Sequence, residues 1–465
     1  MKIKFGTDGW RAIIAQEFTE QNVARVAEAT ATWIKQNGGT SVVVGHDCRF
    51  AGELFVHAII KVMNHHGIKV FTSKGFVSTP MVSLATVKHQ AALGIIITAS
   101  HNPPSYNGFK LKGSYGGPLL PEQVQEIEDM IADTCTVDVR SDLGQSALLE
   151  YIDMETMYVN HAEANFDMDA IRNSPLKLAY DAMYGAGQNV MRRLFPDDVT
   201  FLHCDYNPSF NGQAPEPIHK NLLEFSELIR LADGDIDCGL CTDGDADRIG
   251  LYNSKGEFID SHHIILLLIH YMVKYKGIKG KVCTAFSSTV KIKTLCDHYG
   301  LPLDVVKIGF KYICGIMLEE DVLVGGEESG GIAIKGHIPE RDGIWMGLTL
   351  FEFMAKSGKS LNELIEEVYA ITGKFAFGRN DLQLTETLKN KIVANCEARV
   401  YTQFGKYTVQ RLDDLDGYKY FIDDSTWLMI RASGTEPVLR TYAEAATLEK
   451  AQDILNDVKA VLMQA

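Results

Sequence analysis

Six short apolar runs constrain the fold of this chain most, because each one ends in a polar or glycine-rich loop and together they form three successive pairs. The pairs are 42–47 with 95–100, 178–181 with 240–243, and 282–286 with 323–327. Segments with helical periodicity separate the runs, for example at 21–36, 54–67, 261–276 and 344–356. Strands that alternate with helices form α/β units with mixed, largely parallel sheets, which bind ligands at the loops after the strands. The sequence therefore predicts three similar α/β units whose loop ends meet at a central cleft.

The last part of the chain has a different pattern. Strand-like runs at 409–412, 418–422 and 427–431 follow one another closely, between helical segments at 386–398 and 448–463. This order is typical of a smaller, more antiparallel α+β unit. A chain of 465 residues also exceeds what one hydrophobic core usually supports. We therefore expect four domains, with boundaries at 1–144, 145–254, 255–373 and 374–465.

Charge and composition exclude several classes of partner. A formal charge of −15 argues against binding to nucleic acid or to an anionic membrane surface. The longest apolar run, 264–269, is too short to span a membrane. Residues 1–6 lack the apolar region of a signal peptide, so a cytoplasmic protein is expected. Small molecules are the expected ligands, and the sequence gives no indication of an oligomeric state.

The cysteines do not indicate redox or zinc chemistry. There are nine, an odd number at irregular spacing, which fits reduced thiols. Cys238 and Cys241 form a C-x-x-C pattern, but they lie in a strand-like segment. Because residues three apart on a strand point to opposite faces, a structural role is favoured for both.

The loop at 98–104, with sequence TASHNPP, contains a candidate nucleophile. It follows the apolar run 94–97, and Ser100 is placed where a buried strand ends. A serine hydroxyl needs activation by its neighbours, and His101 and Lys110 are within plausible reach. Ser, Asn and Pro are also common turn residues, so this loop taken alone favours an ordinary turn.

Three alternating carboxylates follow another strand-like run. Asp243, Asp245 and Asp247 can face one point if the loop curls, and hard oxygen ligands suit Mg²⁺. An EF-hand is disfavoured because the sixth position is Arg248 and the twelfth is Ser254. Arg248 could contact a transferring phosphoryl group. The alternative interpretation is a solvated acidic loop.

Two further loops carry groups suited to a sugar phosphate. Residues 325–331 offer Glu327 and Ser329 in a glycine-rich frame, and both can hydrogen-bond sugar hydroxyls. Residues 431–437 combine Arg431 with two hydroxyls and a glycine, which suits a phosphate. Each loop taken alone could equally be an exposed turn.

These four loops, with a fifth motif at 5–11 (FGTDGWR), resemble those of the α-D-phosphohexomutase family and occur in the family's order. The resemblance implies four domains around a cleft, Mg²⁺, and interconversion of hexose 1-phosphate and hexose 6-phosphate. It implies a phosphoserine at Ser100, and a hexose 1,6-bisphosphate that is both intermediate and activator. The expected catalytic residues are Ser100, His101, Lys110, Arg248, Lys311 and Arg11. The expected substrate-binding residues are Glu327, Ser329, Arg341, Arg431, Ser433, Gly434, Thr435 and Arg440. The expected metal ligands are Ser100, Asp243, Asp245 and Asp247.

The choice of sugar rests on smaller details. The run at 309–312 (GFKY), the run at 341–345 (RDGIW) and the absence of a histidine at Gly331 resemble glucomutases. Glucose is therefore favoured, with Lys311 as the general base or acid. Mannose, glucosamine and pentose phosphates stay open as substrates. A metal-dependent sugar phosphatase and a non-catalytic sugar-phosphate sensor are the alternative function classes.

Overall fold

The computed structural model describes residues 2–140, 143–196, 199–432 and 438–464. It divides into two compact units. The first comprises residues 1–281 with 309–365, and the second comprises 282–308 with 366–465. The chain passes between the units at three points, within strand β12 (Lys281–Ala285), between Ile308 and Gly309, and within helix α13 (Leu361–Thr372). Within the described residues, no helix is both long and apolar enough to cross a bilayer.

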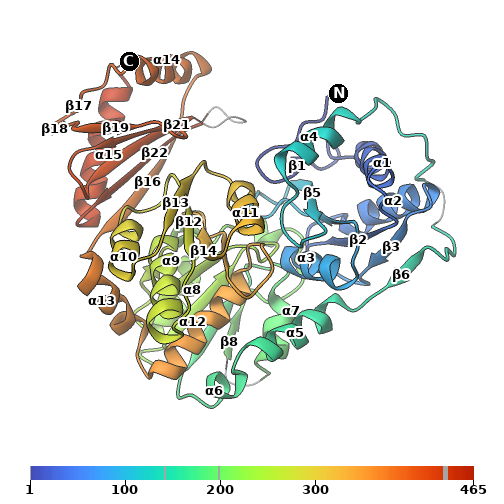
Figure 1. The fold of residues 1–465 in the computed structure, drawn as a ribbon, viewed down its shortest axis with the longest axis horizontal. Helices are drawn as coiled ribbons and strands as arrows, with labels where there is room; N and C mark the ends of the chain where they lie inside the picture. The colour runs from blue at the N-terminus through green and yellow to red at the C-terminus, as the bar shows by residue number, and fades with distance from the viewer. Residues whose placement is uncertain (1, 141–142, 197–198, 433–437, 465) are drawn as a thin grey trace. The chain divides into compact units, whose positions relative to one another are not determined.

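The first sheet of the first unit has six strands in the order β1-β5-β4-β2-β3-β6 (Figure 1). The strands are β1 (Trp10–Ile13), β2 (Ser41–His46), β3 (Lys69–Thr72), β4 (Leu93–Ile97), β5 (Tyr106–Gly113) and β6 (Leu149–Tyr151). The helices are α1 (Glu20–Gln36), α2 (Gly52–His65), α3 (Thr79–Lys88) and α4 (Pro121–Asp129). β2 pairs in parallel with β3 and β4, whereas β5 is antiparallel to β4. The carboxyl ends of β2 and β4 therefore lie at the same edge of the sheet.

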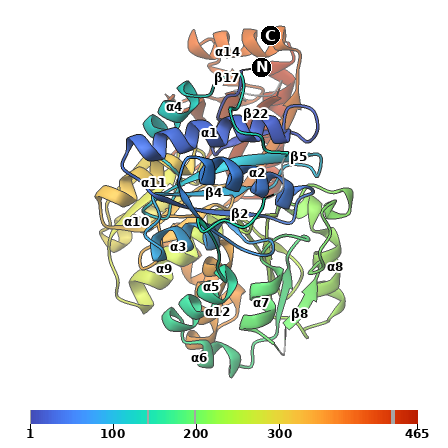
Figure 2. The same ribbon diagram turned by 90° about the vertical axis from the view of Figure 1, so that its right-hand side faces the viewer.

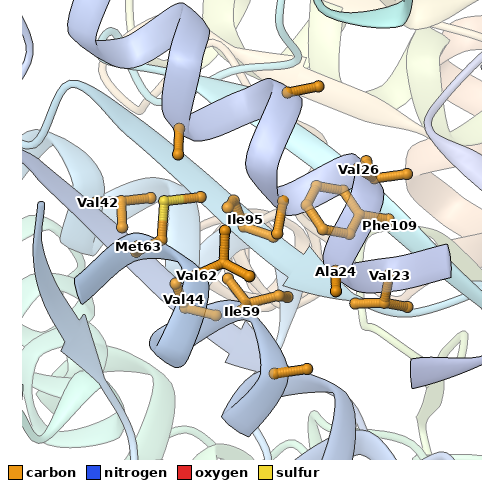
Figure 3. Packing of buried hydrophobic residues seen from close by; sticks show 14 of the residues in the cluster. Val23, Ala24, Val26, Val42, Val44, Ile59, Val62, Met63, Ile95 and Phe109 are labelled. Carbon is orange, nitrogen blue, oxygen red and sulfur yellow. The ribbon is translucent and has the colours of Figure 1, made fainter. Parts of the chain in front are cut away.

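Alternation along β2 and β4 explains how helices cover both faces of this sheet. The ribbon in Figure 2 shows α1 and α3 on opposite sides of β2 and β4. Val42, Val44 and Ile95 are fully buried in one core with side chains from α1 and α2 (Figure 3). Burial of each such side chain contributes about 1.5–3 kcal/mol. On the other face Gly45 and Gly94 lie against α3, where any Cβ would collide with its side chains. The two glycines thus allow α3 to approach the strand ends closely.

The second sheet repeats this plan, in the order β11-β10-β9-β7-β8. Its strands are β7 (Leu178–Asp181), β8 (Val199–Leu202), β9 (Cys238–Thr242), β10 (Ile249–Asn253) and β11 (Phe258–Ile259). Its helices are α5 (Met154–Asn165), α6 (Met168–Arg172), α7 (Gln188–Leu194) and α8 (Leu223–Leu231), with 3₁₀ turns η1 (Phe210–Gly212) and η2 (His219–Asn221). β7 pairs in parallel with β8 and β9, as β2 does with β3 and β4. The predicted repeat is therefore present in the strand pairing.

The third predicted α/β segment contributes to both units. In the first unit are the antiparallel strands β14 (Val322–Gly326) and β15 (Ile332–Ile334), with helices α9 (Ser261–His270), α11 (Phe310–Glu319) and α12 (Gly343–Ser357). A π-helical turn, η3 (Tyr271–Tyr275), follows α9. In the second unit β12, from Val282 on, pairs in parallel with β13 (Leu303–Val306), and α10 (Lys291–Tyr299) lies between the two strands in the chain.

The C-terminal domain in the second unit is antiparallel throughout its main sheet, in the order β16-β22-β21-β20-β19 (Figure 1). Its strands are β16 (Ala376–Gln383), β19 (Arg411–Asp413), β20 (Tyr418–Phe421), β21 (Trp427–Ala432) and β22 (Val438–Ala445), with a hairpin of β17 (Gln403–Phe404) and β18 (Tyr407–Thr408). Helix α15 (Leu448–Leu462) packs on β16 and β22, and α14 (Glu386–Glu397) follows β16. The predicted fold class is confirmed, while the four exact domain boundaries stay a prediction.

Candidate active site

Ser100 lies three residues after the end of β4, and its side chain reaches the acidic loop after β9. Ser100 Oγ donates a hydrogen bond to Asp243 Oδ2 at 2.6 Å, and Nδ1 of His101 lies 3.4 Å from the same hydroxyl. The side chain of Ser100 is almost completely buried. The predicted nucleophile and the predicted metal loop are thus in direct contact although 143 residues separate them in the chain.

The three aspartates form one group of potential metal ligands. One carboxylate oxygen from each of Asp243, Asp245 and Asp247 lies within 4.8 Å of the others, and all three residues are fully buried. Asp243 Oδ1 accepts hydrogen bonds from the backbone N–H groups of Asp247 and Arg248. Oδ1 of Asp245 and Oδ1 of Asp247 are buried with no hydrogen-bond partner among the described residues. Buried carboxylate oxygens without partners fit a divalent cation such as Mg²⁺.

Gly244 is required by the close approach of the two loops. A Cβ at this position would lie 2.6 Å from the carbonyl oxygen of Ser100. Ala246 completes the curl of the loop with a φ of +58°, in the left-handed region. The small residues between the aspartates therefore let the acidic loop pack against the Ser100 loop.

Ion pairs with Lys110 and Arg341 form a closed ring of charges that includes Asp247 of the triad. Lys110 Nζ lies 2.7 Å from Asp245 Oδ2, 2.9 Å from Asp247 Oδ2 and 3.0 Å from Asp8 Oδ2. Arg341 Nη2 contacts Asp247 Oδ2 at 2.9 Å and also binds Asp8. Asp8, Lys110, Asp247 and Arg341 thus alternate in sign around the ring, which satisfies one oxygen of Asp247 and leaves the other for a cation.

The pKa values of Asp243 and Asp245 are shifted in opposite directions. Burial, and then the neighbouring charges of Asp245 and Asp247, raise the pKa of Asp243 well above its usual range. Burial alone would also raise the pKa of Asp245, but Lys110, the hydrogen bond from Thr79 and the charge of Arg341 together lower that pKa. The pKa of Asp243 is therefore the one that an additional positive charge would restore to normal.

Cationic side chains surround the Ser100 hydroxyl. Arg11 Nη1 donates to Asn102 Oδ1 at 2.8 Å, which places the guanidinium beside the Ser100 loop. Arg248 Nε is buried with no hydrogen-bond partner among the described residues. Burial, reinforced by the charges of Arg248 and Arg11, holds the pKa of His101 well below its usual value. The imidazole is therefore neutral, and the arginines supply the positive field that a bound phosphate needs.

The predicted sugar loop lies beside the metal loop. Arg248 and Gly331 form a β-bridge, and the N–H of Ile249 donates to the carbonyl of Gly330 at 3.1 Å. Glu327 Oε1 accepts a hydrogen bond from the N–H of Gly309 at 2.8 Å. Burial, and then the charge of Glu328, raise the pKa of Glu327 to about 7. Glu327 therefore lies in a loop that directly borders the metal loop.

Three other predicted residues of the first unit are Ser329, Lys311 and Arg341. Ser329 is half-buried in the same loop as Glu327. Lys311 is also half-buried near the start of α11, and its Nζ lies 5.6 Å from the centroid of the Tyr312 ring. Arg341 is buried and paired with Asp8 and Asp247 as described above. Its contact with substrate stays a prediction, as does the general-base role of Lys311.

In the second unit two predicted phosphate-binding arginines stand side by side. Arg431 in β21 is in register with Arg440 in β22. Arg431 is paired with Asp416 at 3.2 Å, and Arg440 Nε is buried with no hydrogen-bond partner among the described residues. Like charges directly opposite on neighbouring strands are unfavourable, so the pair suits an anion. The predicted ligands Ser433, Gly434 and Thr435 lie outside the described residues.

Comparison with known protein families gives matches along most of the chain. Residues 2–136, 156–256 and 260–371 match alpha/beta/alpha domains I, II and III of phosphoglucomutase/phosphomannomutase, and residues 388–461 match the C-terminal domain. The chain belongs to the phosphoglucomutase/phosphomannomutase family. As a phosphohexomutase, it is an isomerase that acts by phosphoryl transfer.

Individual phosphohexomutases match over nearly their whole length. A phosphoglucomutase/phosphomannomutase of Thermococcus kodakarensis is 29% identical over 97% of this chain and 96% of its own. A phosphoglucosamine mutase of Limosilactobacillus reuteri is 30% identical, again over 97% and 96%. The crystal structure of a protein assigned as a phosphomannomutase of Thermus thermophilus has a TM-score of 0.88 and 32% identity, and covers 100% of this chain and 99% of its own. The names of these relatives differ in the sugar.

Sequence reasoning missed several residues of this phosphohexomutase site. Asp8 is in the 5–11 motif, where Arg11 alone received a role. Asp47 and Arg49 follow β2, and Thr98 precedes Ser100 by two residues. The pairing of the runs 42–47 and 95–100 was the available signal, since it put the ends of β2 and β4 at one edge. Thr79 at the start of α3 had no signal, although its hydroxyl donates to Asp245 Oδ2 at 2.5 Å.

Proposed function

We propose that this phosphohexomutase interconverts hexose 1-phosphate and hexose 6-phosphate, with glucose as the favoured sugar, through a phosphoserine at Ser100. The observation that carries the proposal is the 2.6 Å hydrogen bond from Ser100 Oγ to Asp243 Oδ2. It joins the candidate phosphate carrier to the candidate metal ligands inside one buried cluster of charges. A serine hydroxyl is a weak nucleophile by itself, and the surrounding cations are what make it a plausible phosphate carrier.

The proposed reaction consists of two phosphoryl transfers. In the first, the bond from phosphorus to Ser100 Oγ breaks while a bond forms from a sugar oxygen to the same phosphorus. The proton of that sugar hydroxyl passes to a general base, for which Lys311 is our candidate, and the leaving Ser100 Oγ takes up a proton from solvent; in the second transfer Ser100 gives up this proton and the leaving sugar oxygen takes one up. The hexose 1,6-bisphosphate then turns in the site, and its other phosphoryl group is transferred back to Ser100 Oγ. The same bisphosphate, supplied from solution, would phosphorylate Ser100 and thereby activate the enzyme.

Several residues assist this chemistry without forming bonds to phosphorus. Asp243, Asp245, Asp247 and a Ser100 phosphate oxygen would hold Mg²⁺, which when bound neutralises charge on the transferring phosphoryl group. Arg11 borders the Ser100 loop through its hydrogen bond to Asn102 Oδ1, so it can orient a phosphate on Ser100. Arg248 and His101 flank the same phosphate. Nδ1 of His101 lies 3.4 Å from Ser100 Oγ, so the imidazole can serve as a hydrogen-bond partner there.

The substrate is bound at its hydroxyls and at its non-reacting phosphate. Glu327 and Ser329 are our candidates for the ring hydroxyls, because their loop borders the metal loop through the bridge between Arg248 and Gly331. The candidates for the phosphate are Arg431, Ser433, Gly434, Thr435 and Arg440, and Arg341 is a separate candidate for a substrate contact. The unusual register of Arg431 with Arg440 supports a phosphate site there.

The identity of the sugar is a separate part of the proposal. The run at 309–312 and the glycine at position 331 favour glucose. Relatives of nearly equal similarity are named phosphoglucomutase/phosphomannomutase and phosphoglucosamine mutase, so mannose and glucosamine are the alternatives. One hydroxyl or amine decides between these sugars, and such a difference is worth a large factor in kcat/KM only where a polar partner is placed for it.

The test is a coupled assay with Mg²⁺ and a trace of glucose 1,6-bisphosphate. Glucose 1-phosphate, mannose 1-phosphate and glucosamine 1-phosphate are compared for wild type and Ser100→Ala. Preferred turnover of glucose 1-phosphate, lost in S100A, is the expected result. Preference for another sugar retains the mechanism and corrects the substrate. Full mutase activity in S100A refutes the phosphoserine, and release of inorganic phosphate without isomerisation would make the protein a phosphatase.

A further inference from the structure

Ser100 has a backbone conformation that residues with a side chain seldom adopt. Its φ is +51°, in the left-handed region. This region is disfavoured by contact of Cβ with the following carbonyl, so it persists only where the surroundings hold it. The direction of the Cα–Cβ bond, and hence the position of Oγ beside Asp243, depends on this conformation. The groups that hold the backbone of Ser100 therefore decide where its hydroxyl lies.

Two buried side chains bind the backbone of Ser100, one on each side. The N–H of Ser100 donates to Thr98 Oγ1 at 2.9 Å, and its carbonyl accepts from Arg49 Nη2 at 2.7 Å. The Thr98 hydroxyl in turn donates to Asp47 Oδ2 at 2.5 Å, and Arg49 Nε lies 3.3 Å from the same oxygen. Asp47, Arg49 and Thr98 are essentially inaccessible to solvent. Asp47 thus ties the two contacts together.

Arg49 also fixes the rest of the loop. Nη2 donates to the carbonyl of Asn102 at 2.6 Å, and Nη1 donates to those of Pro103 at 2.8 Å and Tyr106 at 3.0 Å. One planar guanidinium therefore gathers four carbonyls, including that of Ser100. A lysine ammonium, with three donors on one atom, cannot reproduce this fork. The Phe210 ring lies 4.9 Å from the Arg49 guanidinium carbon and helps to keep it in place.

We propose that Thr98 and Arg49 are positioning residues for phosphoryl transfer. They hold Ser100 in the left-handed conformation, so that its Oγ stays beside Asp243 whether or not it carries a phosphoryl group. This inference rests on the proposed role of Ser100 as phosphate carrier. Neither residue forms or breaks a bond, and their effect is on the alignment of the reacting atoms. A displacement of about 1 Å at such a centre can cost about a hundredfold in rate.

Two substitutions of Thr98 separate positioning from packing. Thr98→Val keeps the shape and removes the hydroxyl, whereas Thr98→Ser keeps the hydroxyl and removes a methyl group. Positioning predicts that kcat falls about tenfold to a hundredfold in T98V and less than about threefold in T98S. KM should change less than about twofold in both, because neither variant alters a proposed substrate contact. Equal kcat losses in both, a larger loss in T98S, or no loss in T98V overturns the proposal.

Arg49 is tested with a matched arginine from the same unit. Arg25 is also buried, and its Nε donates to the carbonyl of Ala132 at 2.6 Å, in a separate part of the domain. Arg49→Lys should lower kcat about a hundredfold and shift the ³¹P NMR signal of phospho-Ser100, whereas Arg25→Lys should do neither. Equal kcat values for R49K and R25K would overturn the proposal. If R49K does not fold, the Thr98 pair decides the question.

Failure of this inference is distinguishable from failure of the proposed function. If wild type lacks mutase activity, or S100A retains it, the role of Ser100 is refuted and the positioning role with it. If wild type is active, S100A is inactive, and T98V matches wild type in kcat, only the positioning role is refuted. Mass spectrometry of the Ser100 peptide in each variant shows whether the phosphoserine itself was formed.

Discussion

Glu327→Gln should change the pH dependence of stability in a direction that the structure fixes. The Glu327 side chain is 5% exposed, and burial, followed by the charge of Glu328, raises its pKa from 4.5 to about 7. Because the folded-state pKa exceeds the unfolded one, the stabilising contribution is complete below about pH 4.5. It is lost as the pH rises through about 7. At 1.36 kcal/mol per pH unit, the shift corresponds to about 3 kcal/mol of unfolding free energy.

Glutamine stays neutral, so E327Q does not undergo this loss. The unfolding free energy of E327Q relative to wild type should therefore rise by up to about 3 kcal/mol between pH 4.5 and pH 8.5. Urea denaturation at a series of pH values measures it, with tryptophan fluorescence as the signal. Three of the four tryptophans, Trp10, Trp33 and Trp345, are in the first unit with Glu327.

Glu352→Gln is the matched control of opposite sign. Burial would raise the pKa of Glu352, but its hydrogen bonds from Tyr271 and other neighbours lower it to about 2. Its contribution is therefore lost only as the pH falls below the unfolded value. Between pH 5 and pH 8.5 the difference between E352Q and wild type should stay constant. A difference between E327Q and wild type that is equally flat over this range would refute the assignment of a raised pKa to Glu327.

Three further outcomes are expected from the geometry of the site. Mg²⁺ at about a hundred times its Kd should stabilise wild type by about 2.7 kcal/mol in thermal unfolding, and Asp247→Asn should lose most of this gain; equal gains in both would place the metal elsewhere. Asp8→Asn leaves Lys110 and Arg341 in excess within a buried ring, so urea denaturation should show a loss of about 3–5 kcal/mol, and a loss below about 1 kcal/mol would contradict the ring's importance. Gly244→Ala brings a Cβ to 2.6 Å from the Ser100 carbonyl and should cost about 1–3 kcal/mol and much of kcat, whereas at Gly75 a Cβ meets nothing within 4 Å and alanine should be tolerated.

The sequence predicted which loops carry Ser100 and Asp243, and part of the reason is topological. Ser100 follows β4 and Asp243 follows β9, and these strands pair in parallel with β2 and β7 of two different sheets. Parallel strands have their carboxyl ends at the same edge of their own sheet, so each residue lies at an edge that can bind a ligand, whereas the meeting of the two edges was inferred from the internal repeat and the family resemblance. The C-terminal domain was predictable for a similar reason, since strands separated by short turns pair antiparallel.

The contacts that refine the site could not be predicted in the same way. Arg49 binds four backbone carbonyls. Every residue has a backbone carbonyl, so the sequence does not indicate which of them point toward an arginine. The left-handed conformation of Ser100 could not be predicted from the sequence either, because glycine or asparagine is the usual signal for this conformation. Segment 261–276 was predicted as one helix, but the α-helical part ends at His270 and a π-helical turn follows. Hydrophobic periodicity does not distinguish between these two windings over one turn.

The internal repeat places the candidate nucleophile after one strand and the candidate metal ligands after its counterpart. After β2, Asp47 Oδ1 accepts the N–H of Arg49 at 2.8 Å, and after β7, Asp181 Oδ1 accepts the N–H of Met183 at 2.7 Å. The same turn is therefore built twice, and the residue two positions after the aspartate differs. In the first repeat the guanidinium of Arg49 gathers four carbonyls of the neighbouring loop, including that of Ser100. The second repeat lacks that cation, and its neighbouring loop instead presents three carboxylates with two oxygens left for a metal ion.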